Sequence, residues 1–198
     1  MLKIVCKERQ LSVTELNWSW LLLGVTLLIL PALAQAKLEP QVSYQGTAYQ
    51  LCAQQRVTKA LFFDVVDVGV YYPDCHLADS VFDSQHKLIR FSYLRKVTGI
   101  QFTQGADEFL AENLTETEKN SCLNDFTAFN SIYKDVVAKD YYDLFVLPDQ
   151  GLNLYLNQSP LAQLNIPECT IPYLNIWFGT ESMDNDFSEL QKKLESLN

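Results

Sequence analysis

One apolar run, Ala60 to Tyr72 (ALFFDVVDVGVYY), limits the folds open to this chain more than any other stretch. Valine and aromatic residues dominate it, and such residues pack well on a pleated sheet. Both alternating faces of the run are mostly apolar, and Pro73 closes it, which argues against a helix. The run therefore predicts a central strand covered on both sides. Asp64 and Asp67 place one carboxylate on each face, and we expect each near a strand end or beside a Lys or Arg.

The first 36 residues have the composition of a secretory leader. Three basic residues, Lys3, Lys7 and Arg9, precede an apolar stretch from Trp18 to Leu33, and Ala34-Gln35-Ala36 has the form of a cleavage site. Residues 1–36 are therefore predicted to be a signal peptide, and residues 37–198 one domain in the periplasm or outside the cell. An uncleaved anchor is the alternative, although a spanning helix needs about 20 apolar residues. We expect no membrane span after cleavage, and the oligomeric state stays open.

The composition argues against nucleic acid as a partner. The chain carries a formal net charge of −9, whereas a binder of phosphate backbones needs a strong basic patch. The densest basic cluster consists of Lys87, Arg90, Arg95 and Lys96, which is too thin for that role.

Four cysteines remain after the predicted leader: Cys52, Cys75, Cys122 and Cys169. An exported compartment permits disulfides, so all four are disulfide candidates, and the three possible pairings stay open. No CxxC pair and no Cys/His spacing indicates a metal site, and we expect neither a metal nor another cofactor.

The remaining patterns alternate between strands and helices. Helical stripes are formed by Phe102, Ala106, Phe109 and Leu110 and by Cys122, Phe126, Phe129 and Tyr133, and Thr115 to Glu118 is a capping box. The predicted strands are 42–52, 87–94, 140–147, 151–157 and 161–166, with a connector at 53–59, and further helices are predicted over 170–178 and from Asp184. This order predicts an α+β fold, an antiparallel sheet with helices against one side.

No catalytic signature emerges. Both histidines, His76 and His86, lie in polar stretches, and neither a GxSxG motif nor a phosphate-binding glycine loop is present. An apolar-cored exported domain of this kind more often binds than reacts. Arg56 stands alone before the central strand, where it would either pair with an anionic head group at a pocket mouth or lie solvated in a turn.

The chain resembles the chalcone isomerase-like proteins, in particular their exported bacterial branch, from about Gly46 to Leu194. The motifs that carry the resemblance are Leu51–Pro73 (LCAQQRVTKALFFDVVDVGVYYP), Lys87–Gly99 (KLIRFSYLRKVTG), Phe129–Val136 (FNSIYKDV), Pro148–Asn157 (PDQGLNLYLN) and Asn175–Gly179 (NIWFG). The resemblance implies an antiparallel sheet with a helical layer, an open-faced sandwich whose ligand cleft lies between sheet and helices.

The plant enzymes of that family close a chalcone ring with five polar residues. Their Arg corresponds to Arg56, their central-strand Thr to Val66, their Tyr to Phe102, their Asn to Phe109 and their last Thr to Ile176. Four of the five positions are apolar here. Because each lost donor to a developing charge costs roughly 3 kcal/mol, the resemblance implies a protein that is not a chalcone isomerase.

Our first hypothesis is therefore a non-catalytic exported protein that binds a small apolar or amphipathic ligand, such as a fatty acid. Arg56, or Lys59 in its place, would hold the acid group, and the cleft would be lined by Val66, Tyr71, Phe102, Phe109 and Ile176. An isomerase or lyase with an unidentified substrate is one alternative. The other is an interaction protein whose cleft is filled by its own side chains.

Overall fold

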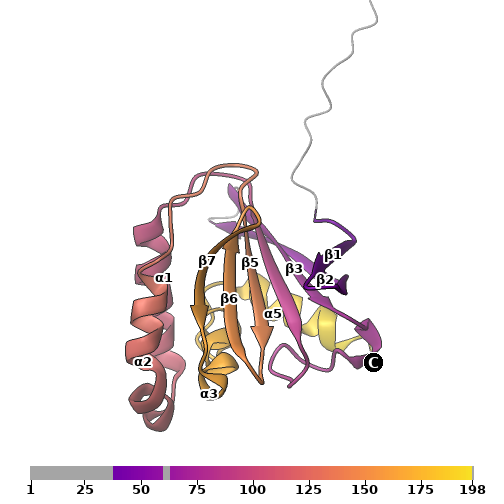
Figure 1. Ribbon diagram of the computed structural model, residues 1–198. Coiled ribbons are helices and arrows are strands. Elements are labelled where there is room, and N and C mark those ends of the chain that lie inside the picture. The colour runs from indigo at the N-terminus through magenta and orange to yellow at the C-terminus, as the bar shows by residue number, and fades with distance from the viewer. Residues whose placement is uncertain (1–37, 60–62, 198) are drawn as a thin grey trace, which may run out of the picture. The chain divides into compact units, whose positions relative to one another are not determined.

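The strands of the sheet lie side by side in the order in which they occur in the sequence. The structure, a computed structural model, describes residues 38–59 and 63–197, so the predicted leader lies outside the described residues. Seven strands pair antiparallel in sequence order, and helices cover one face (Figure 1). The strands are β1 (Gln41–Tyr44), β2 (Thr47–Lys59), β3 (Phe63–Tyr72), β4 (Lys87–Tyr93), β5 (Tyr141–Leu147), β6 (Gly151–Leu156) and β7 (Ser159–Leu164). The predicted α+β class is confirmed.

The helices enter at two points of the chain. Between β4 and β5 lie α1 (Gly99–Asn113) and α2 (Glu116–Asn130), and after β7 lie α3 (Pro167–Thr170), η3 (Pro172–Leu174), α4 (Asn175–Phe178) and α5 (Asn185–Glu195), while a short turn, η2 (Cys75–Leu77), follows β3. None of the helices in the described part is long and apolar enough to cross a membrane.

The central strand is buried on both faces, as predicted. Val66, Val68 and Val70 belong to the main core beneath the helices, whereas Tyr71 packs into a second cluster on the opposite face. The described part of β3 begins at Phe63, and residues 60–62 of the predicted strand lie outside the described residues. Asp64 and Asp67 both pair with Arg56 of the neighbouring strand, as expected for carboxylates on such a strand.

A bulge interrupts the pairing of β2 with β3. The register passes from Val57 opposite Val66 to Thr58 opposite Asp64, so Val65 is an extra residue on β3. Because of the bulge, Val65 and Val66 both face the space beneath the helices.

The prediction of a single strand over residues 42–52 followed by a connector over 53–59 is wrong. Gln45 and Gly46 have φ values of 47° and 83°, and they form a two-residue turn between β1 and β2. β2 then runs through the supposed connector as far as Lys59, because its polar residues pair with β3 on one side.

Side-chain caps fix the starts of the long helices. The predicted capping box of Thr115 and Glu118 is confirmed at α2, and a second one, Thr98 with Gln101, begins α1. The prediction of one helix over residues 170–178 is wrong. α3 already begins at Pro167, and Pro172 divides the segment into α3, η3 and α4, since a proline cannot donate a helical hydrogen bond.

Two disulfides tie the helices and turns to each other and to the sheet. Cys52 of β2 is joined to Cys75 of η2, and Cys122 of α2 to Cys169 of α3. This is one of the three pairings that the sequence left open.

The face of the sheet opposite the helices is covered by the β1–β2 hairpin. Tyr44 of β1 stacks on Phe145 of β5 with ring centroids 3.7 Å apart. Beside this cluster, Arg90 forms a buried two-fold hydrogen bond with Asp143, at 2.6 and 2.8 Å. The Tyr71 hydroxyl is buried on the same face with no partner among the described residues.

Candidate functional site: a cavity between sheet and helices

A cavity of about 420 Å³ lies between the sheet and helices α1, α4 and α5. Its volume falls within the range of small-molecule sites, and its walls are mainly apolar. The wall residues are Val57 and Val66 from β2 and β3, Phe91 and Tyr93 from β4, Tyr142 and Leu154 from β5 and β6, Phe102 and Ala106 from α1, Ile176 and Trp177 from α4, and Phe187 from α5.

Aromatic contacts hold the cavity walls in place. The Phe102 ring meets the rings of Tyr93 and Tyr142 edge to face, with centroids 5.4 and 5.5 Å away. Phe91 packs against Trp177 at 4.8 Å. Each ring therefore fixes its neighbour, and the cavity has the preformed walls that favour ligand binding.

The Tyr93 hydroxyl is a polar group of the cavity wall that remains available to a ligand. The other two tyrosine hydroxyls of the wall are engaged, because Tyr133 lies 3.1 Å from the Tyr173 hydroxyl and Tyr142 donates to the carbonyl oxygen of Lys134 at 3.0 Å. No described residue hydrogen-bonds the Tyr93 hydroxyl. Burial raises the pKa of Tyr93 well above its ordinary value, so this hydroxyl keeps its proton at neutral pH and can donate.

Three basic side chains stand at the mouth: Lys59, Arg95 and Lys96. Lys59 is engaged, with its Nζ 3.3 Å from Asp184, and Lys96 lies 3.5 Å from an Asp135 oxygen. Arg95 makes no ion pair with any described residue. Its guanidinium lies 4.9 Å from the centre of the Phe63 ring, so its charge is free to meet an anion.

Four of the seven predicted ligand residues come together in this cavity. Lys59, Val66, Phe102 and Ile176 line it. By the resemblance, Val66, Phe102 and Ile176 correspond to polar positions of the plant enzymes, and here all three are apolar lining residues of the cavity.

The other three predicted residues lie elsewhere. Arg56 is held by Asp67 at 2.7 and 2.9 Å and by Asp64 at 2.9 Å, and it is not among the lining residues of the cavity. These hydrogen bonds, first of all those with Asp67, raise the pKa of Arg56. Tyr71 points to the opposite face of the sheet, and Phe109 of α1 does not line the cavity either.

Sequence reasoning missed Tyr93, Arg95 and Trp177. The alternation of β4 places Tyr93 on the same face as Ile89 and Phe91, so the signal for Tyr93 was present in the sequence. Arg95 was grouped with Lys87 and Arg90 as one basic cluster. The structure separates this cluster, because Lys87 and Arg90 are buried in the sheet while Arg95 is exposed at the mouth.

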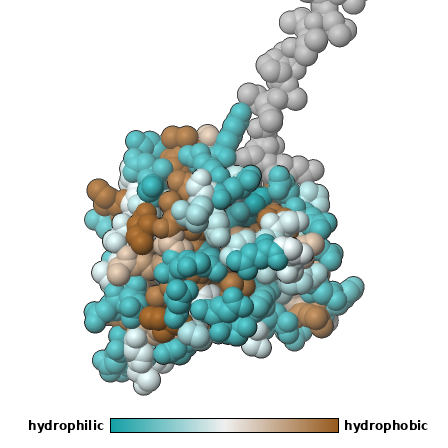
Figure 2. Space-filling view, in the orientation of Figure 1, coloured by the Kyte–Doolittle hydropathy of each residue, from teal (hydrophilic) through white to brown (hydrophobic). Residues whose placement is uncertain are grey.

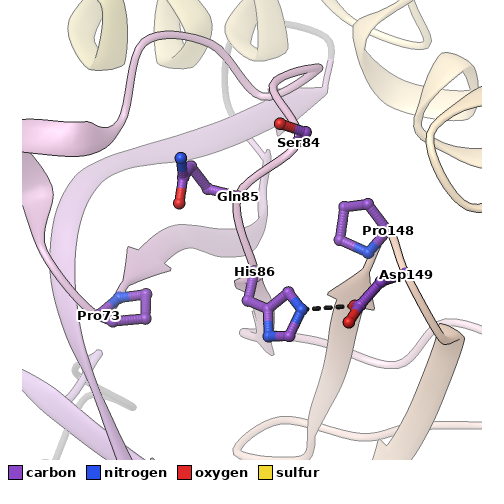
Figure 3. A pocket seen from close by; sticks show the side chains of 6 residues that line it. All are labelled: Pro73, Ser84, Gln85, His86, Pro148 and Asp149. Atoms are coloured by element: carbon purple, nitrogen blue, oxygen red, sulfur yellow. Dashed lines mark hydrogen bonds and ion pairs between the residues drawn. The ribbon is translucent and has the colours of Figure 1, made fainter.

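A second, open hollow lies beside Pro73 and Pro148 and contains a close contact between His86 and Asp149 (Figure 3). His86 Nε2 lies 2.6 Å from Asp149 Oδ1, and Ser84 belongs to the same hollow. Figure 3 shows Ser84 well apart from the His86 ring, and no hydrogen bond joins them. A Ser/His/Asp nucleophile needs that bond, so these three residues do not form a catalytic triad.

No group of three or more His, Cys, Asp and Glu side chains in residues 38–59 and 63–197 is arranged to hold a metal ion.

The comparisons with known proteins agree with this architecture. In fold, the chain is similar to the crystal structure of a fatty-acid binding protein from Arabidopsis thaliana, with a TM-score of 0.53 and 16% sequence identity over 79% of this chain and 98% of that chain. At this identity the likeness concerns the fold alone. A comparison with curated proteins gave no match. A sequence model described as chalcone isomerase-like matches residues 31–194, which is most of the chain, and the protein therefore belongs to the chalcone isomerase-like family.

Proposed function

We propose that this protein binds a small apolar or amphipathic ligand, such as a fatty acid, in the cavity between sheet and helices, and that it does so without catalysis. The observation that carries the proposal is the cavity itself: apolar walls, one free hydroxyl inside and one unpaired guanidinium at its mouth. The similarity in fold to a plant fatty-acid binding protein supports the same ligand class.

Arg95 is the best partner for the acid group of such a ligand. It reaches the cavity mouth and has no carboxylate partner among the described residues, whereas Arg56 is occupied by Asp64 and Asp67. Lys59 is close enough to assist, although Asp184 already neutralises part of its charge. With the carboxylate at Arg95, the alkyl chain would extend past Phe102 along the apolar walls.

The apolar substitutions in the wall argue against ring closure. Val66, Phe102 and Ile176 cannot donate a hydrogen bond to a developing oxyanion, and each missing donor costs roughly 3 kcal/mol of transition-state stabilisation. The isomerase alternative would need another donor, such as Tyr93, and a screen of enone and phenolic substrates tests it. The filled-cleft alternative would have no cavity beside Phe102, yet Phe102 lines this one.

We also propose that the protein acts in the periplasm or outside the cell. The leader-like composition of residues 1–36 and the two disulfides support this location, because disulfides persist in oxidising compartments. Mass measurement of the protein from the exported fraction tests cleavage after Ala36. A mass that still includes the leader would favour the anchored alternative.

Displacement of a fluorescent fatty-acid analogue tests the site. Arg95→Gln should weaken the affinity about tenfold, because a charge-assisted hydrogen bond is lost, and Tyr93→Phe should weaken it about threefold. Ala106→Phe should abolish binding. Ala106 is a buried residue of the cavity wall, so the larger phenyl ring would fill space that the ligand needs.

Arg56→Gln is the matched control for Arg95→Gln. It removes the same charge from a position outside the cavity, and circular dichroism should show that both variants are folded. Equal loss of affinity in the two variants would contradict the assignment of Arg95, and unchanged affinity in Ala106→Phe would contradict the cavity as the site.

A further inference from the structure

We propose that the mouth of the cavity docks on an anionic lipid bilayer, from which the ligand enters. The docking surface consists of residues 94–100 and 131–140, here called the mouth loops, which join β4 to α1 and α2 to β5. Val97 and Val136 pair through their backbones at 2.9 and 3.1 Å, so the two loops form one surface. The inference rests on the proposed ligand class, and its test below separates the two.

Exposed hydrophobic side chains gather on the mouth loops. Ile100 is 70% exposed, Val137 53% and Ile132 37%, and Phe63, which is 51% exposed, lies against Arg95. These are four of the six large hydrophobic side chains that are exposed in the described part. Figure 2 shows hydrophobic residues at the upper left of the molecule, over the region where these loops run in Figure 1. Such a concentration marks an interaction surface.

The charge of the mouth loops is opposite to that of the chain. They contain four basic and two acidic residues, a net charge of 4 − 2 = +2, whereas the whole chain carries −9. The basic residues are Arg95, Lys96, Lys134 and Lys139, and the acidic ones are Asp135 and Asp140.

The acidic side chains of the mouth loops accept hydrogen bonds from the protein's own backbone, whereas most of the basic side chains form no ion pair with a described residue. Asp135 accepts the backbone N–H of Gly99 at 3.0 Å and lies near Lys96, and Asp140 accepts that of Val137 at 2.8 Å. Among the described residues, none forms an ion pair with Arg95, Lys134 or Lys139. Three unpaired cations around apolar side chains complement anionic head groups over a hydrocarbon layer.

The docking surface is continuous with the cavity. Arg95, Lys96 and Val97 belong to the mouth loops and also line the cavity. Tyr133 lines both the cavity and a neighbouring hollow that contains Ile100 and Lys134. An alkyl chain that left a bilayer here would therefore meet apolar walls without crossing bulk water, which lowers the cost of transfer.

A bilayer fits this surface better than a protein partner does. Lysine is depleted from protein–protein interfaces, whereas lysine beside scattered aliphatic side chains is typical of segments that lie in a membrane interface. The apolar side chains here are separated by basic residues along both loops.

Flotation with lipid vesicles tests the proposal. Residues 37–198, which contain the whole sheet and both hydrophobic clusters, are mixed with vesicles of phosphatidylcholine alone or of equimolar phosphatidylcholine and phosphatidylglycerol. We expect binding to the anionic vesicles only, and weaker binding at high salt. Lys134→Gln/Lys139→Gln should lower the partition coefficient about 25-fold, at roughly fivefold for each charge, and Ile100→Ser/Val137→Ser should lower it at least tenfold.

Matched variants on other surfaces serve as controls. Lys119→Gln/Lys192→Gln removes the same charge from helices α2 and α5, and Leu77→Ser removes an exposed leucine from η2; each should change binding less than twofold. The proposal is overturned if the mouth variants and these controls bind vesicles equally, or if the wild type does not prefer anionic vesicles.

Fatty-acid affinity in solution, measured on the same variants, separates this proposal from the proposed function. Lys134→Gln/Lys139→Gln should keep its fatty-acid affinity while it loses the vesicles. Fatty-acid binding without vesicle binding in the wild type would overturn the docking surface alone. Vesicle binding that depends on the mouth loops in a protein without fatty-acid affinity would overturn the proposed ligand and leave the docking surface supported.

Discussion

Replacing Arg90 by methionine should destabilise this protein by about 3–5 kcal/mol at pH 7. Arg90 and Asp143 lie opposite each other on β4 and β5, with side chains only 7% and 5% exposed, and they share two hydrogen bonds of 2.6 and 2.8 Å. Removal of the guanidinium leaves a buried carboxylate without its countercharge, which is the costly way to break such a pair. Glu39, a third member, is 66% exposed and can turn to solvent.

The loss should shrink as the pH falls. Burial already raises the pKa of Asp143, and the hydrogen bonds from Arg90 oppose that rise. In Arg90→Met the opposition is gone, so the folded-state pKa of Asp143 lies further above its unfolded value of about 4. The variant therefore keeps its stability below about pH 4 and loses it as the pH rises through the folded-state pKa. The gap to the wild type should be widest near neutral pH.

Urea denaturation at several pH values measures this effect. Arg95→Met is the matched control, because Arg95 is exposed and forms no ion pair with a described residue, and it should cost less than about 1 kcal/mol. Arg90→Met/Asp143→Leu should recover most of the stability, since an apolar pair leaves no buried charge. A cost below about 1 kcal/mol for Arg90→Met, or a double variant no more stable than the single one, would show that the buried pair does not stabilise the fold in this way.

Two further stability predictions follow from the covalent and backbone structure. Cys122→Ser/Cys169→Ser should lower the free energy of unfolding by about 4 kcal/mol, because the disulfide closes a loop with a sequence separation of 47, and an unchanged urea midpoint would contradict this. Gly151→Ala should cost about 3 kcal/mol or more, since Gly151 has a φ of 129° and a Cβ would lie 1.9 Å from the carbonyl oxygen of Leu164. Thermal unfolding checks it, and Gly46→Ala, which meets no atom within 4 Å, should cost less.

The fold was largely predictable because local signals and burial agree over most of the chain. The capping box at Thr115, the stripe of Cys122, Phe126 and Phe129, and the apolar β3 each specify one element without reference to the rest. The errors fall where a single residue changes the outcome. Gly46, at positive φ, forms a hairpin turn, whereas the alternating pattern around it predicts one continuous strand. Pro172 divides an apolar segment whose composition predicts a single helix.

The site was less predictable than the fold. Val66, Phe102 and Ile176, chosen by position-by-position correspondence with the plant enzymes, all line the cavity, because their positions depend on sheet and helix register. The correspondence could not show that Arg56 is neutralised by Asp67, since this pairing depends on the register between β2 and β3.

The sequence also did not show which basic side chains are exposed. Arg90 and Arg95 are five residues apart and look equivalent in the sequence. One lies within the sheet beside a carboxylate, and the other lies just beyond the end of β4, where the chain turns toward α1. Arg90 is structural because it lies within β4, and Arg95 is a candidate ligand-binding residue because it lies beyond the end of that strand.

Native mass spectrometry of the purified protein is the most direct test of ligand binding in the cavity. We expect a mass above that of the chain with its two disulfides, and release of a fatty acid or similar carboxylate on denaturation. Ala106→Phe, folded by circular dichroism, should carry no such adduct. A bare chain mass for the wild type, unchanged after incubation with fatty acids, would show that the cavity does not bind this ligand class.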